Sequence, residues 1–73
     1  MIKQGMFILM DETLNRPAYK GQSVVSFRGE YATLLYGDAP HKPDSTGRVA
    51  VRNAAGRVET FFPSVFDLKW MRA

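Results

Sequence analysis

The sequence predicts a small all-β domain with a barrel-like architecture. Apolar residues alternate or form short runs, and they do not recur at helical spacing for long enough to build a helix. Turn residues interrupt the chain about every 8–12 positions, which is typical of small sandwiches and barrels. With 73 residues the chain is long enough for one domain only. We therefore expect a single domain over residues 1–73 with about five or six short strands that close into a barrel and leave no exposed sheet edge.

The first half of the chain is expected to hold three of these strands. Residues 6–10 are all apolar and predict a buried strand. Residues 11–22 contain proline, glycine and asparagine and predict a loop with room for one helical turn. Two further β-rich segments, 23–28 and 31–36, are joined by a tight turn at Gly29.

The clearest predicted element is a hairpin that follows the long polar loop 37–46. In its first strand Val49 and Val51 alternate with more polar neighbours. Residues 53–56 end in glycine, as a type I turn with a left-handed last residue requires. The returning strand, 57–62, places alternate residues on one face, and these are Val58, Thr60 and Phe62.

The end of the chain resembles the closing segment of SH3 domains. That segment is Phe61-Phe62-Pro63-Ser64-Val65-Phe66-Asp67-Leu68-Lys69. The resemblance implies an SH3-like barrel with a short 3₁₀ turn near residues 63–66 and a last strand over 67–70. The Ala-Leu-Tyr-Asp-Tyr segment and the tandem tryptophan of SH3 domains are missing, so the resemblance supports the barrel and not the binding of proline-rich peptides.

Two looser likenesses concern function. The segment Gly47-Arg48-Val49-Ala50-Val51 is similar to the KOW-type barrels of ribosomal proteins and transcription elongation factors, which implies a nucleic-acid-binding module. The small size, the lack of cysteine and the methionine-rich start look like the small early proteins of tailed phages, several of which bind and redirect host enzymes such as RNA polymerase. This likeness implies a regulator that acts in the cytoplasm of a bacterial host.

Composition narrows the function classes further. The absence of cysteine excludes disulfides and cysteine-based metal sites and fits a reducing compartment. The net charge is +3, with acids and bases interleaved, which permits nucleic acid binding without requiring it. The N-terminal apolar run is too short for a signal peptide or a membrane span.

Three segments contain residue types that can take part in chemistry, and none predicts catalysis. His41 is the only histidine, and no cysteine or second histidine accompanies it as a metal ligand. Asp11 and Glu12 are adjacent carboxylates, for which solvation or a turn cap is the better interpretation. Residues 44–48 lack the spacing of a phosphate loop and predict a turn. We expect no catalytic residue, no metal and no cofactor, and hence no enzyme.

The candidate binding site is the outward face of the hairpin. Arg48, Arg52 and Arg57 are expected to share that face, with Glu59 and Phe61 beside them. Arginines offer bidentate contacts, and an exposed aromatic ring adds an anchor for a partner. The alternative is a solvated sheet face with weak ion pairs.

These observations predict a non-catalytic protein that docks on a host or phage protein, with neither a membrane nor a small-molecule substrate involved. The predicted contact residues are Arg48, Arg52, Arg57, Phe61 and Tyr31. A first alternative is nucleic acid binding through the same patch, with Tyr31 or Phe61 stacking on bases. A second alternative is a small structural component of a virion.

Overall fold

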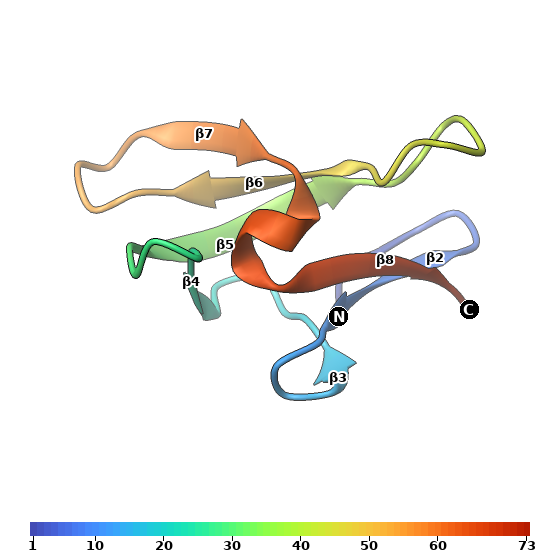
Figure 1. Cartoon of the computed structure of the whole chain (residues 1–73), viewed down its shortest axis with the longest axis horizontal. Coiled ribbons are helices and arrows are strands. Elements are labelled where there is room, and N and C mark those ends of the chain that lie inside the picture. Colours follow the sequence, from blue (N-terminus) through green and yellow to red (C-terminus); the bar gives the residue numbers. More distant parts are fainter.

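Apolar runs separated by turn residues form eight strands and one 3₁₀ turn in the computed structural model, which describes residues 1–73 (Figure 1). The strands are β1 (Lys3–Gln4), β2 (Phe7–Asp11), β3 (Arg16–Pro17), β4 (Ser23–Val25), β5 (Tyr31–Asp38), β6 (Arg48–Arg52), β7 (Val58–Phe61) and β8 (Leu68–Arg72). The 3₁₀ turn, η1 (Pro63–Phe66), lies between β7 and β8. The predicted all-β class and the 3₁₀ turn are confirmed. No helix is present that has the length and apolarity to cross a bilayer.

The strands form two antiparallel sheets of four strands each. In the first sheet β2 is central, and β1, β3 and β8 all pair with it. The second sheet has the order β4-β5-β6-β7. No hydrogen-bonded ladder joins the two sheets, so the closed barrel that the sequence predicts is not formed. The chain turns the corner after β7 through η1, where Pro63 has no N–H to continue a ladder.

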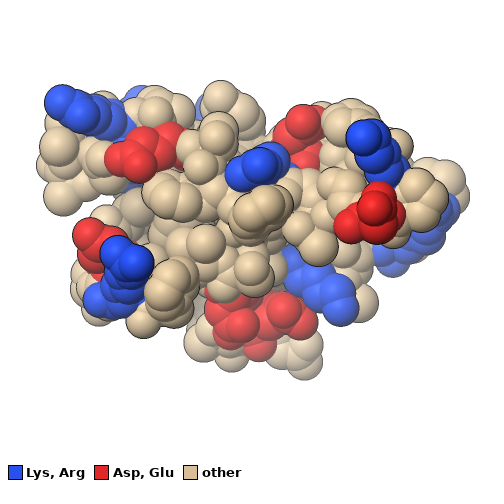
Figure 2. Space-filling model, turned by 45° about the horizontal axis from the view of Figure 1, so that its top comes forward, with Lys and Arg blue, Asp and Glu red and all other residues tan.

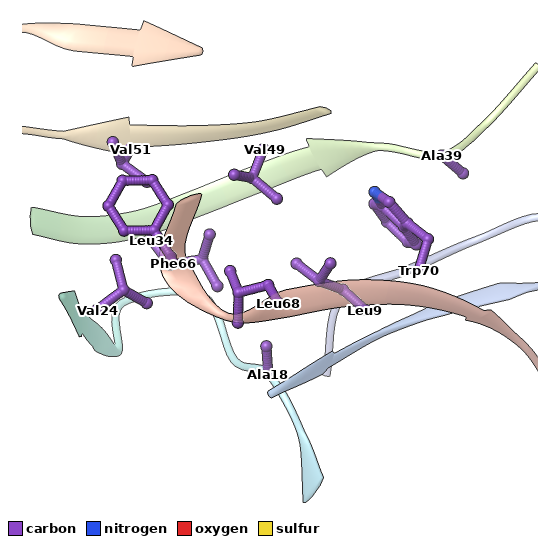
Figure 3. Packing of buried hydrophobic residues seen from close by; sticks show 10 residues of the cluster. All are labelled: Leu9, Ala18, Val24, Leu34, Ala39, Val49, Val51, Phe66, Leu68 and Trp70. Atoms are coloured by element: carbon purple, nitrogen blue, oxygen red, sulfur yellow. The ribbon is translucent and has the colours of Figure 1, made fainter. Parts of the chain in front are cut away.

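The core lies between the two sheets, whose inner side chains point toward one another (Figure 3). Its buried members are Leu9, Ala18, Val24, Leu34, Ala39, Val49, Val51, Phe66, Leu68 and Trp70. Phe66 lies near one end of this layer and Trp70 near the other (Figure 3). Burial of this apolar layer is the main force that holds the sheets together.

Trp70 of β8 packs its indole ring against two glycines of the segments that form and precede the second sheet's strands, Gly37 and Gly47. Its indole Nε1 donates a hydrogen bond to the Arg48 carbonyl oxygen at 3.3 Å. A Cβ atom at Gly37 would lie 2.5 Å from the ring, and one at Gly47 would lie 2.6 Å from it. Gly47 also has a φ of +77°, a conformation that favours glycine. The indole ring therefore requires both glycines.

The β6–β7 hairpin is present, but its register differs by one residue from the predicted one. Arg52 lies opposite Val58, not opposite Arg57. Gly56 donates its N–H to the Asn53 carbonyl at 2.9 Å and has a φ of +82°, so the expected turn and its left-handed glycine are both present. Arg57 belongs to the loop closure, because its carbonyl accepts the N–H of Asn53 at 2.9 Å.

A shift of one residue moves every side chain of the returning strand to the other face. Glu59 pairs with Val51, and Phe61 pairs with Val49, so both side chains lie on the core side of the sheet. Alternation carries Arg57 to the same side. Val58, Thr60 and Phe62 share the opposite face with Arg48 and Arg52. The prediction that Phe61 and Arg57 lie on the outward face with Arg48 and Arg52 is therefore wrong.

Candidate functional site

The five predicted contact residues are divided between the two faces of the second sheet. Arg48 and Arg52 point away from the core, and Tyr31 does the same because it is two residues before Thr33, the partner of Arg52. Phe61 points to the core side, and Arg57 lies in the exposed hairpin loop on that side. The structure thus does not bring the three arginines together.

A cleft of about 740 Å³ opens on the core side of the second sheet, at the end where the first sheet no longer covers it. Nine of its 14 lining residues are hydrophobic, which makes it the more apolar of the two main cavities. The lining, called the aromatic cleft below, is Ser26, Phe27, Arg28, Glu30, Tyr31, Ala32, Val51, Asn53, Ala54, Ala55, Glu59, Phe61, Val65 and Phe66. Figure 2 shows an uncharged, hollowed region between lobes that carry both acidic and basic side chains.

The inner wall of the aromatic cleft is a pair of fixed phenylalanines. Phe61 of β7 and Phe66 of η1 meet edge to face, with ring centroids 5.4 Å apart and an interplanar angle of 84°. This is a favoured geometry for two aromatic rings. Phe66 is buried in the core, and Phe61 is half-buried. The wall is therefore an extension of the core that reaches the surface, where it can receive an apolar side chain.

The turn after β4 contributes Phe27 to the lining of the cleft, and this residue is 76% exposed. The sequence predicts a β-rich segment over 23–28 that includes Phe27, but β4 ends at Val25. The hydroxyl oxygen of Ser26 accepts the N–H groups of Arg28 and Glu30, both at 3.2 Å, and turns the chain there. The Phe27 N–H donates to the Val65 carbonyl at 3.0 Å, which fixes this turn against η1.

The rim of the cleft has charges of both signs. Arg28 lies 5.7 Å from the centre of the Phe27 ring, and Glu30 follows in the same turn. On the hairpin side Glu59 accepts a hydrogen bond from the Asn53 amide. The Ser26 hydroxyl oxygen is occupied by two backbone donors, and no base lies beside it.

A second cavity, of about 620 Å³, lies between residues 40–46, η1 and β8, and only three of its 14 lining residues are hydrophobic. His41 lies at its edge, and its Nε2 is 3.0 Å from Asp38 Oδ1. No group of three or more histidine, aspartate or glutamate side chains is placed to hold a metal ion.

One signal in the sequence points to the turn that carries Phe27. Ser26 and Gly29 flank a two-residue turn, and a serine three residues before a glycine is a turn signature. Given that turn, Phe27 could have been placed outside the strand. Comparisons of this chain with protein-family models, with curated proteins and with solved structures gave no match.

Proposed function

We propose that this protein is a small non-catalytic binding module that receives a protein partner in the aromatic cleft. The observation that carries the proposal is the exposed Phe27, which lines the same cleft as the Phe61–Phe66 ring pair. Aromatic anchors that border a preformed apolar pocket are the usual centres of protein interfaces. An exposed phenylalanine costs solubility and is favoured where a partner covers it.

The charges of the rim indicate which partner surface fits. Arg28 supplies a positive charge, and Glu30 and Glu59 supply negative charges around the apolar centre. A complementary partner has one or two apolar side chains flanked by residues of both signs. A standard interface buries roughly 800 Å² per partner. The whole protein exposes 5085 Å², so such a partner would cover about a sixth of its surface.

The finer identity of the fold and the partner is part of the proposal. The order of hairpin, proline-led 3₁₀ turn and last strand supports an SH3-like fold whose sheets remain open at one end. We propose a phage-encoded regulator or inhibitor that acts in the cytoplasm of a bacterial host, with a host complex such as RNA polymerase as the partner. The likenesses described for the sequence support this identity.

A pull-down from bacterial lysate with the tagged full chain tests the binding proposal. The wild-type protein should retain a partner in stoichiometric amount, and Phe27→Ala should lose it, because the anchor ring is removed. Phe62→Ala is the matched control, since Phe62 is also an exposed phenylalanine but lies on the other face of the sheet. Absence of any stoichiometric partner, or equal loss with both variants, would contradict the proposal.

A further inference from the structure

The face of the second sheet that points away from the core carries an unusual set of exposed side chains. Tyr31 is 71% exposed, Tyr36 58% and Phe62 54%, and Val25 and Val58 are also exposed there. Two arginines, Arg48 and Arg52, stand among them. We call this surface the outer face; its members are Val25, Tyr31, Thr33, Tyr36, Asp38, Arg48, Ala50, Arg52, Val58, Thr60 and Phe62.

A β-bulge places Tyr36 on the outer face. Leu34 pairs with Val51 and points into the core, so simple alternation would send Tyr36 inward as well. The register shifts between Leu34 and Tyr36, and Tyr36 pairs with Ala50 instead. Bulges are features that redirect side chains, and here the bulge turns an aromatic ring out of the core.

The aromatic and basic side chains of the outer face gather around Ala50. This residue is only 1% exposed although it points away from the core, so the larger side chains of its neighbours must cover it. Tyr36 and Thr60 flank it on the adjacent strands. Beside it the Arg48 guanidinium lies 4.1 Å from the centre of the Phe62 ring, a stacked cation–π arrangement. The result is a platform of exposed aromatic rings with one guanidinium group stacked over the Phe62 ring.

The charged side chains of this platform indicate which class of molecule binds there. The register places Arg48 and Arg52 on the outer face and sends Glu59, the one acid of the hairpin, to the other side. The acid that remains, Asp38, is at the end of β5 and lies 3.0 Å from the His41 ring nitrogen. The outer face carries two arginines and one aspartate, so two copies docked face to face would each present a net positive charge. A polyanion with flat apolar groups fits better.

We infer that the outer face binds single-stranded nucleic acid. Bases stack on the rings of Tyr36 and Phe62, because every base has an aromatic face and stacking tolerates any sequence. Arg48 and Arg52 contact the phosphates, and the hydroxyl groups of Thr33 and Thr60 lie within the same surface. This site shares only Tyr31 with the aromatic cleft and does not depend on the function proposed for it.

Fluorescence anisotropy of a labelled oligothymidylate of about 12 nucleotides, titrated with the full chain, tests this inference. Binding in the micromolar range is expected at about 50 mM salt, and it should weaken as salt rises because counterions are released. Arg48→Gln and Arg52→Gln should each reduce the slope of log K against log salt by about 0.7. Tyr36→Ala combined with Phe62→Ala should weaken binding about tenfold or more.

Matched controls lie in two loops beside the second sheet and not on its outer face. Arg57→Gln removes an arginine of the same hairpin, and Phe27→Ala removes an exposed ring, and neither should change the affinity for the oligonucleotide. A dispersed amide spectrum for every variant shows that it is folded. No binding at low salt, or an equal loss in the Arg57 control, would overturn the inference. A protein partner in the pull-down that requires Phe62 and not Phe27 would also overturn it, since the outer face would then be a protein interface.

Discussion

Asp11 shows how one buried acid can organise a loop without taking part in chemistry. Its Oδ1 accepts the N–H groups of Thr13 and Leu14 at 3.0 and 3.1 Å, and its Oδ2 accepts the Gln22 side-chain amide at 2.9 Å. The turn cap expected from the sequence is therefore present. The sequence did not reveal that the side chain is buried, because Gln22 reaches it from 11 residues away.

Removal of this carboxylate should destabilise the fold. Asp11→Ala leaves three donors without their acceptor, and we expect a loss of about 1–3 kcal/mol in the free energy of unfolding. Asp11→Asn retains one acceptor oxygen and should lose less. Urea unfolding followed by tryptophan fluorescence measures both values. An alanine variant as stable as the wild-type protein would show that these bonds contribute nothing net.

Two glycines with similar backbone angles should respond differently to the same substitution. Gly47 has a φ of +77°, and a Cβ there would lie 2.6 Å from both the Asp38 carbonyl oxygen and the Trp70 ring. Gly56 has a φ of +82° but no atom within 4 Å of such a Cβ. Gly56→Ala should cost about 1–2 kcal/mol for the left-handed conformation alone. Gly47→Ala should cost roughly 2 kcal/mol more, because the new atom also overpacks the indole contact.

The fluorescence of Trp70, the only tryptophan, separates these two effects. Its emission should change in Gly47→Ala and remain as in the wild-type protein in Gly56→Ala. Equal losses of stability in the two variants would show that the packing of Trp70 against Gly47 is looser than the structure describes.

At the scale of the element, the hairpin marks the limit of what the pattern of residues could predict. The two strands, the turn residues and the left-handed Gly56 were all predictable from residues 47–62. The register was not, because the returning strand has a phenylalanine on each face, Phe61 and Phe62. Either face could therefore have been the apolar one. The hydrogen bond between Asn53 and Arg57 sets the register. Because of it, residues 53–57 connect the two strands, one residue more than the predicted 53–56.

The same limit applies to the bulge in β5. Nothing in the segment 31–36 indicates that alternation breaks between Leu34 and Tyr36. The bulge depends on how β5 pairs with β6, which is a property of two strands and not of one. Sequence reasoning therefore found the aromatic residues of the second sheet but could not assign them to its faces.

At the scale of the whole molecule, the all-β class followed from the short apolar runs. The position of η1 followed from Pro63 and from the resemblance of this segment to the end of SH3 domains. The closed barrel did not, because closure depends on backbone pairing between the two sheets, and no such ladder forms. The open end exposes the core-side surface beyond Phe66, and this is where the aromatic cleft lies. The second sheet thus offers two surfaces of different chemistry, an apolar cleft with mixed charges and a basic aromatic platform.

The division of side chains between these two surfaces depends on the β6–β7 register, and cross-strand nuclear Overhauser effects between Hα protons test it directly. Because the Asn53–Arg57 pair is hydrogen-bonded, the close Hα pairs of this ladder should be Arg52 with Val58 and Ala50 with Thr60. Observation of these two contacts would support the account. A contact of Val51 with Val58 instead would place Phe61 and Arg57 beside Arg48 and Arg52, and both proposed surfaces would be lost.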